Sequence, residues 1–274
     1  MAEIVKPFTG ISGPARLLRG FAVDFLNSHN AAAVRDIMDP GYQLTIGGHV
    51  FSGRDDHYLP AALAQLEQFP GLCVTVHDVL LAPDAVAMLF TEHGASRRSQ
   101  GRAAAWGAIA LFRIERGRLR YGWADEDYFA RKRQLATGIC DPVRAPHPCP
   151  WDTSVVAADE ATATTARGWL ADPTGLASGA IVEQICAGGP ALADLIAIEA
   201  VDVEVLVSAG PRAAFRAFAR GRYAGGFTEV APSQRGAPVG LSVTGLLTVA
   251  GGQVASVQIA FDRLSLQRSL SDRG

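Results

Sequence analysis

Apolar residues recur at two different spacings along the chain, and the order of these spacings predicts the class of fold. In the first half, helical spacing predicts helices at Pro14–Ser28, Ala31–Met38 and Asp55–Gln68. Alternation bounded by turn residues predicts strands at Tyr42–Ser52, Leu72–Leu81, Ala85–His93, Ala103–Glu115 and Arg118–Tyr128. Helices first and a long antiparallel meander last is the order of an α+β domain.

The second half repeats the end of this order. Helices are predicted at Ala161–Leu170 and Ala177–Ala187, and strands at Ala197–Val207, Ala213–Tyr223, Val239–Val249 and Gln253–Asp262. The segment HDVLLAPDAVAMLFTEHG aligns with VEVLVSAGPRAAFRAFARG, and GRLRYGWADEDYFARKRQL aligns with GQVASVQIAFDRLSLQRSL. Two copies of one unit explain this similarity. We therefore expect a first domain at residues 1–137, a Pro-rich linker at 138–158 and a shortened second domain at 159–274.

Composition narrows the class of protein. The chain has 274 residues, 49% of them hydrophobic, and a formal net charge of −2. This apolar fraction can fill two cores and excludes intrinsic disorder. The net charge shows no excess of basic residues, which a nucleic-acid-binding protein would need. The uncharged stretch 236–261 is interrupted by Pro238 and Gly251-Gly252, which favours a β-hairpin over a membrane helix.

The cysteines and the N-terminus predict a cytoplasmic protein. The four cysteines are scattered, which favours reduced thiols, and the N-terminus has no apolar signal segment. Cys140, His147 and Cys149 lack a fourth ligand, so no metal site is predicted. No glycine-rich phosphate loop or dinucleotide fingerprint occurs, so we expect no cofactor.

Several motifs in the first half resemble a known family. They are the opening helix, GGHVFSGRDDHYL, the helix exit FPGL and the ending GRLRYGWADEDYFARKRQL, with Gly117, Leu119, Trp123, Asp127, Gln134 and Leu135 in the matching places. This set resembles the SnoaL-like polyketide cyclases of the nuclear transport factor 2-like superfamily, over residues 14–135 and more weakly over 161–270. The resemblance implies two tandem cone-shaped α+β barrels, each a curved antiparallel sheet around helices with an apolar cavity inside.

Asp127 is the first candidate for a catalytic residue. The resemblance implies that it is the base that removes a proton α to a carbonyl, a role that needs a desolvated carboxylate. A two-residue turn at Arg116-Gly117 would place Asp127 opposite Trp106. The same face would then carry Trp123, Tyr121 and Phe112. A slip of one residue would move Asp127 to the other face, where it would be an exposed acid in a charged run.

Histidines and aromatic residues supply the other candidates. All six histidines precede residue 150, and we favour His93 and His49 as a second acid–base group because imidazole titrates near neutral pH. The alternative for each is a half-buried structural histidine. The expected substrate-binding wall comprises Trp106, Trp123, Tyr42, His57, Phe112 and Tyr121.

The second copy differs from the first. Asp262 stands where Asp127 does, but this half contains no histidine. Arg216 and Arg220 on a neighbouring strand are expected to neutralise Asp262 and lower its pKa. The second copy is therefore predicted to be a structural partner that forms an intrachain pseudo-dimer. Two active sites and a further homo-oligomer are left open.

These features together favour an enzyme without a cofactor. The leading hypothesis is a lyase or cyclase that uses acid–base chemistry of aldol or retro-aldol type on a hydrophobic aromatic or polyketide-like small molecule. The first alternative is an isomerase similar to ketosteroid isomerase. The second is a non-catalytic binder of an apolar metabolite. No nucleic-acid or membrane partner is expected, and the substrate and the direction of reaction are left open.

Overall fold

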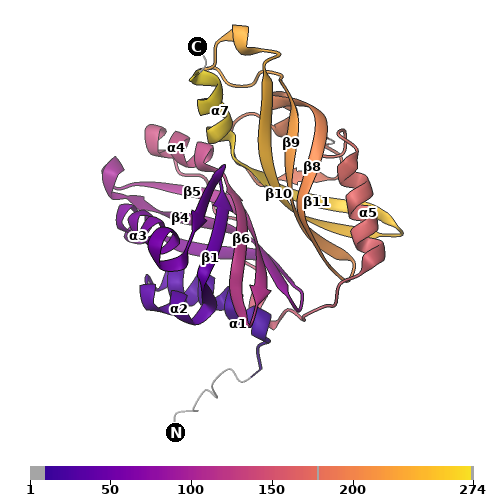
Figure 1. The fold of residues 1–274 in the computed structure, drawn as a ribbon. Helices are drawn as coiled ribbons and strands as arrows, with labels where there is room; N and C mark the ends of the chain where they lie inside the picture. The colour runs from indigo at the N-terminus through magenta and orange to yellow at the C-terminus, as the bar shows by residue number, and fades with distance from the viewer. Residues whose placement is uncertain (1–9, 178, 273–274) are drawn as a thin grey trace.

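The computed structural model describes residues 10–177 and 179–272 (Figure 1). In the first half, a helix begins at α1 (Gly13–Arg19), where Ser12 caps its N-terminus, and continues with π-helical hydrogen bonding as η1 (Gly20–Asn27). The other helical segments are η2 (Ala31–Ala33), α2 (Val34–Ile37), η3 (Arg54–Tyr58), α3 (Leu59–Gln68), η4 (Arg97–Ser99) and α4 (Tyr128–Thr137). The strands are β1 (Met38–Ile46), β2 (His49–Ser52), β3 (Cys73–Leu81), β4 (Ala85–Ser96), β5 (Arg102–Glu115) and β6 (Arg118–Glu126).

The six strands form one mixed sheet in the order β2-β1-β6-β5-β4-β3. β1 runs parallel to β6, and every other neighbouring pair is antiparallel. Alternate residues of β4, β5 and β6 face the helices, and this inner face forms the main core with residues such as Phe25, Met88 and Phe112. Helices α1, α2 and α3 lie on the side of the sheet that faces away from the second half (Figure 1).

The second half contains a five-stranded mixed sheet in the order β7-β11-β10-β9-β8. Its elements are η5 (Pro150–Asp152), α5 (Glu160–Ala171), β7 (Val182–Gln184), α6 (Leu192–Leu195), β8 (Ile196–Ala209), β9 (Arg212–Tyr223), η6 (Pro232–Gln234), β10 (Pro238–Ala250), β11 (Gln253–Phe261) and α7 (Arg263–Ser271). The predicted helix at 177–187 is wrong, because Val182 pairs with Val257 in a parallel ladder between β7 and β11. Pairing at the sheet edge outweighs the helical spacing of this short segment.

The two sheets repeat one topology. β7 runs parallel to β11 as β1 runs parallel to β6, and a β-bulge occurs at equivalent places, between Arg113 and Ile114 and between Thr248 and Val249. The α+β class and the repeat predicted from the sequence are confirmed, and the stretch 236–261 contains the expected hairpin. The limits of the linker stay a prediction.

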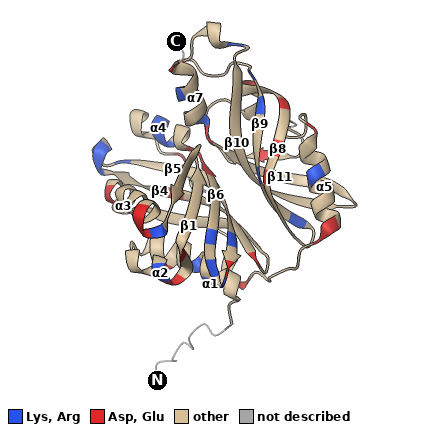
Figure 2. Cartoon of the chain, in the orientation of Figure 1, with Lys and Arg blue, Asp and Glu red and all other residues tan. Residues whose placement is uncertain are grey.

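The outer faces of the two sheets pack against each other. The apolar interface contains Leu80, Ala82, Ala85, Ala87, Leu89, Ile109 and Leu111 from the first half and Val207, Ala209, Ala214, Leu246 and Ala260 from the second. The arrangement is that of a pseudo-dimer within one chain (Figure 1). Acidic and basic residues are interspersed over both halves (Figure 2). Among the described residues, no helix is long and apolar enough to cross a membrane.

Candidate functional site

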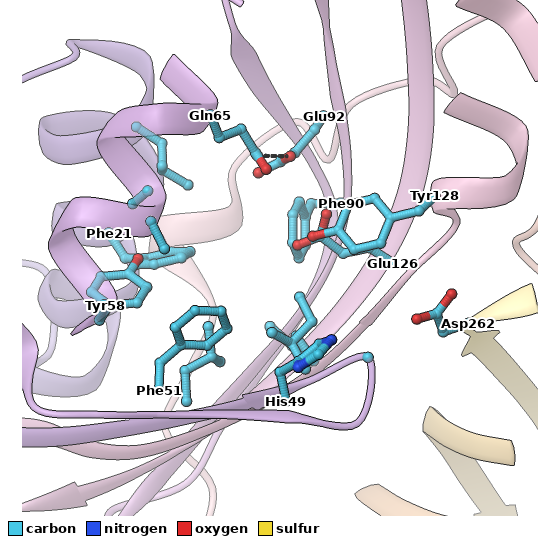
Figure 3. A pocket seen from close by; sticks show the side chains of 18 of the residues that line it. Phe21, His49, Phe51, Tyr58, Gln65, Phe90, Glu92, Glu126, Tyr128 and Asp262 are labelled. Carbon is cyan, nitrogen blue, oxygen red and sulfur yellow. Dashed lines mark hydrogen bonds between the residues drawn. The ribbon is translucent and has the colours of Figure 1, made fainter. Parts of the chain in front are cut away.

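The inner face of the first sheet and the helices that cover it enclose a cavity of about 280 Å³ (Figure 3). Its size is near the lower end of the range for small-molecule sites. Most of its wall is apolar because the alternating inner residues of the strands are apolar. The apolar strand residues of the lining are Leu44, Ile46, Phe51, Phe90, Ala110, Phe112 and Ala124, and η1 adds Phe21 and Leu26.

Two glutamates interrupt this apolar wall. Glu92 on β4 lies directly across the ladder from Trp106 on β5, and Glu126 ends β6. Trp106 Nε1–H donates to Glu126 Oε2 at 3.0 Å, and Gln65 Nε2–H donates to Glu92 Oε2 at 2.6 Å. The two glutamates are only 3% and 7% exposed. A substrate in the cavity would therefore meet two carboxyl groups that are shielded from water.

Burial and mutual repulsion perturb both carboxyl groups. Desolvation raises the pKa of Glu92 and of Glu126, and the charge of Glu126 raises the pKa of Glu92 further. The Trp106 hydrogen bond favours the ionised form of Glu126. Two interacting carboxyls of this kind titrate as a pair. The Glu126 charge and the Trp106 hydrogen bond to Glu126 both make Glu92 the member of the pair that holds a proton more readily.

A half-buried arginine sits above the pair. The guanidinium carbon of Arg131 lies 4.3 Å from the ring centre of Tyr128 and 5.0 Å from that of Trp106. Its charge lowers the pKa of both Glu92 and Glu126, which opposes their desolvation. The Tyr128 ring lies next to Glu126 at the edge of the cavity (Figure 3). Arg131 therefore limits the cost of holding a carboxylate inside an apolar wall.

Tyr42 on β1 lines the same cavity and carries an unpaired hydroxyl group. Its side chain is fully buried, and no partner for its hydroxyl exists among the described residues. Gly122 makes room for it, since a Cβ at that position would come within 2.2 Å of the Tyr42 oxygen. Burial raises the pKa of Tyr42, so the phenol keeps its proton. A buried hydroxyl without a partner is unusual in a folded protein.

The second half forms part of the cavity mouth. Asp262 and Ser265 line it from the start of α7, and Arg268 lines it from the last turn of that helix. His49 lines it from the β1–β2 hairpin (Figure 3 labels Asp262 and His49). Contact is close at Gly47, which has φ +53°, because a Cβ there would lie 2.7 Å from Asp262 Oδ2. The expected site in the first half is therefore shared between the two halves.

The prediction that Asp127 lies opposite Trp106 is wrong. The bulge between Arg113 and Ile114 shifts the register, so that Glu126 pairs with Ala108 and the Asp127 N–H donates to Gly107 O at 2.9 Å. Glu126 consequently takes the inward place. Phe112 lines the cavity, and its role in substrate binding stays a prediction. Trp123 instead packs against the interface between the two sheets, and Tyr121 stacks beside it with ring centres 6.1 Å apart.

Asp127 joins the two halves of the molecule. It is fully buried, caps the N-terminus of α4 through Ala130 N–H, and also accepts from Ala187 N–H at 3.1 Å. Arg263 donates to both of its oxygens and forms a buried ion pair with it. Burial raises the pKa of Asp127, and the Arg263 charge opposes that rise. The expected base is thus placed as a structural carboxylate outside the cavity lining.

The favoured histidines do not come together. His49 lines the cavity mouth, but His93 lies on the other face of β4, where its Nε2 is 3.0 Å from Thr75 Oγ1. Burial lowers the pKa of His93. His57 is exposed, with Nδ1 2.5 Å from the carbonyl oxygen of Ser52. Within the described part of the chain, no group of three or more His, Cys, Asp or Glu side chains is placed to hold a metal ion.

The partners of Asp262 are not the arginines expected from the sequence. It caps α7 by accepting from Leu264 N–H at 3.0 Å and Ser265 N–H at 3.1 Å. The prediction that Arg216 and Arg220 neutralise it is wrong. These arginines pair with Glu204 and Asp202, which lie beside them on β8.

The second half lacks the two acids of the first. The hairpins align Glu92 with Ala219, because Glu92 pairs with Trp106 as Ala219 pairs with Leu241. They likewise align Glu126 with Phe261. These replacements are apolar and buried, and they belong to the second core. The acid pair exists in one copy of the unit.

Glu92 and Glu126 were not predicted as site residues, although the sequence pattern contains a signal for them. Glu92 continues the inward alternation of Met88 and Phe90 on β4, so an acid stands where the pattern calls for a large apolar residue. Glu126 follows Ala124 in the same way.

Comparisons with known proteins find one family model and several solved structures. Residues 18–121 match the family model described as a SnoaL-like domain. Comparison with curated proteins gives no match. Among solved structures, IdmH from Streptomyces antibioticus, provisionally described as a polyketide cyclase, is 20% identical with a TM-score of 0.40, over 45% of this chain and 98% of its own.

Two further solved structures are similar over about half of the chain. A protein from Jannaschia, provisionally described as a SnoaL-like polyketide cyclase, is 16% identical with a TM-score of 0.43, over 49% of this chain and 98% of its own. An epoxide hydrolase of the LEH-like type from M. tuberculosis is 14% identical with a TM-score of 0.40, over 47% of this chain and 89% of its own.

Proposed function

We propose that the protein is a cofactor-independent enzyme that moves a proton α to a carbonyl group of a hydrophobic small molecule. The observation that carries this proposal is the pair of buried carboxyls, Glu92 and Glu126, in the lining of an apolar cavity. Tyr42, whose hydroxyl is unpaired, lines the same cavity. Perturbed carboxyls in a cleft are typical of acid–base catalysis. The catalytic unit would be residues 1–137, and residues 159–274 would complete the cavity mouth.

The roles follow from the state of each group. Glu126, as the carboxylate, takes the proton from the α carbon, and the electron pair of the broken C–H bond moves onto the carbonyl oxygen. Tyr42 donates a hydrogen bond to that developing oxyanion. The enolate then attacks a second carbonyl in an aldol cyclisation, for which protonated Glu92 supplies the proton. If Glu126 instead returned the abstracted proton to a different carbon, the reaction would be an isomerisation. The reverse of the aldol step would be a lyase reaction.

The test measures proton removal directly, without knowledge of the natural substrate. 2-Tetralone serves as a small aromatic ketone, and exchange of its α hydrogens in D₂O is followed by NMR. We expect the wild-type protein to accelerate exchange over buffer. Glu126→Gln should reduce that acceleration by roughly 100- to 10,000-fold, the range of general-base catalysis, and Glu92→Gln should also reduce it.

The control is Glu183→Gln, which removes a carboxylate from the β7 edge of the second sheet, and it should leave exchange unchanged. Thermal melting of each variant establishes that it is folded. Exchange by the wild type that survives in both Glu126→Gln and Glu92→Gln would contradict the proposed roles. Binding of 2-tetralone without any acceleration would favour a binding protein instead.

A further inference from the structure

The mouth of the cavity differs in chemistry from its interior. The interior combines apolar walls with the acid pair, whereas His49, Asp262, Ser265 and Arg268 gather at the mouth. Three of these four residues belong to the second half. The mouth is therefore where a substrate would present a polar end after burying its apolar body.

Both carboxylate oxygens of Asp262 already accept hydrogen bonds from residues of α7. Its Oδ1 accepts from two backbone N–H groups, and its Oδ2 accepts from Ser265 Oγ at 2.6 Å. The positive end of the α7 dipole further offsets its charge. Asp262 is only 3% exposed, so little of its surface is left to bind a ligand.

Arg268 has the opposite character. It is exposed and lines the cavity, and within residues 10–177 and 179–272 it has neither an ion pair nor a hydrogen bond to its side chain. Six other arginines of the second half each pair with an acid. His49 across the same mouth also lacks a side-chain partner in the described structure. The mouth therefore offers a free guanidinium and a free imidazole to a ligand.

We propose that Arg268 and His49 bind a carboxylate at the outer end of the substrate. The substrate of this cavity would then be an apolar, ring-sized molecule with a terminal carboxylate, whose reacting ketone lies deeper beside Glu126. This inference rests on the proposed function of the cavity and adds the class of substrate. A guanidinium suits this role because its N–H groups match the geometry of a carboxylate.

The test compares two probes with the same apolar body. 2-Naphthylacetate and 2-naphthylacetamide are titrated into the full chain at pH 7 by isothermal calorimetry. We expect the wild type to bind the carboxylate about fivefold more tightly than the amide, as for a partly exposed ion pair. Arg268→Gln should remove this preference, and Arg268→Glu should reverse it. Affinity for the amide should change little in Arg268→Gln.

Arg235→Gln is the matched control, since Arg235 is also an exposed arginine of the second half without an ion pair in the described structure, and it lies away from this cavity. It should keep the preference for the carboxylate. If Arg268→Gln keeps that preference too, the proposed carboxylate site is wrong, whereas binding of both probes would still support the cavity. If the wild type binds neither probe, both the carboxylate site and the cavity's role in ligand binding are overturned.

Discussion

At the scale of single residues, the Tyr42 hydroxyl is expected to affect stability and activity in opposite directions. A buried hydroxyl without a partner costs about 1–3 kcal/mol of desolvation that nothing in the free protein returns. Tyr42→Phe keeps the ring that packs on Tyr58 at 5.0 Å and removes only the hydroxyl. We expect unchanged or greater stability, by up to about 2 kcal/mol, together with slower exchange of 2-tetralone. Urea unfolding and NMR exchange measure the two effects.

Tyr121→Phe is the control for that substitution, because Tyr121 lies outside the cavity lining. It should alter neither stability nor exchange. A loss of more than about 1 kcal/mol in Tyr42→Phe would show that its hydroxyl has a partner in the free protein. An unchanged exchange rate would remove Tyr42 from the proposed chemistry.

At the scale of elements, the contact between β6 and β10 carries a buried carboxyl. Asp125 accepts from Ser242 Oγ at 2.5 Å and from Thr244 Oγ1 at 2.6 Å. Burial raises its pKa to about 6. Since the folded state then holds the proton more tightly than the unfolded state, stability from this group falls as the pH rises from about 4 to about 6.

Asp125→Asn should remove that loss, which amounts to about 3 kcal/mol across the window. Urea unfolding at several pH values between 4 and 7 measures it as a flatter dependence than in the wild type. Asp152→Asn, at an exposed position, should retain the wild-type slope. Equal slopes in the wild type and Asp125→Asn would mean that Asp125 titrates normally in the folded protein.

The same elements show how far sequence patterns reach. Alternation and turn residues predicted β4, β5 and β9 to within a few residues, because periodicity and turn chemistry are local. The turn at Arg116-Gly117 was also predicted, but the bulge beside it was not. A bulge depends on packing across the sheet. The bulge shifts the register of β5 and β6 by one residue, and this shift places Glu126, instead of Asp127, on the face toward the cavity.

At the scale of the whole molecule, a charged residue of the second half affects the pKa of an acid in the cavity of the first half. The second half has Ala219 and Phe261 at the places of Glu92 and Glu126, and its Asp262 lines the cavity of the first half. The negative charge of Asp262 raises the pKa of Glu126. Burial is the main cause of the raised pKa of Glu126, and the charge of a carboxylate in the other half adds to it.

Asp262→Asn tests this coupling. Asparagine can still cap α7, so the fold should persist, but loss of the negative charge should lower the pKa of Glu126. Exchange of 2-tetralone needs Glu126 ionised, and its rise with pH should therefore occur at lower pH than in the wild type. Asp272→Asn, at the far end of α7, should leave the profile in place. Coincident profiles for the wild type and Asp262→Asn would mean that the second half supports the cavity mechanically and leaves its base unaltered.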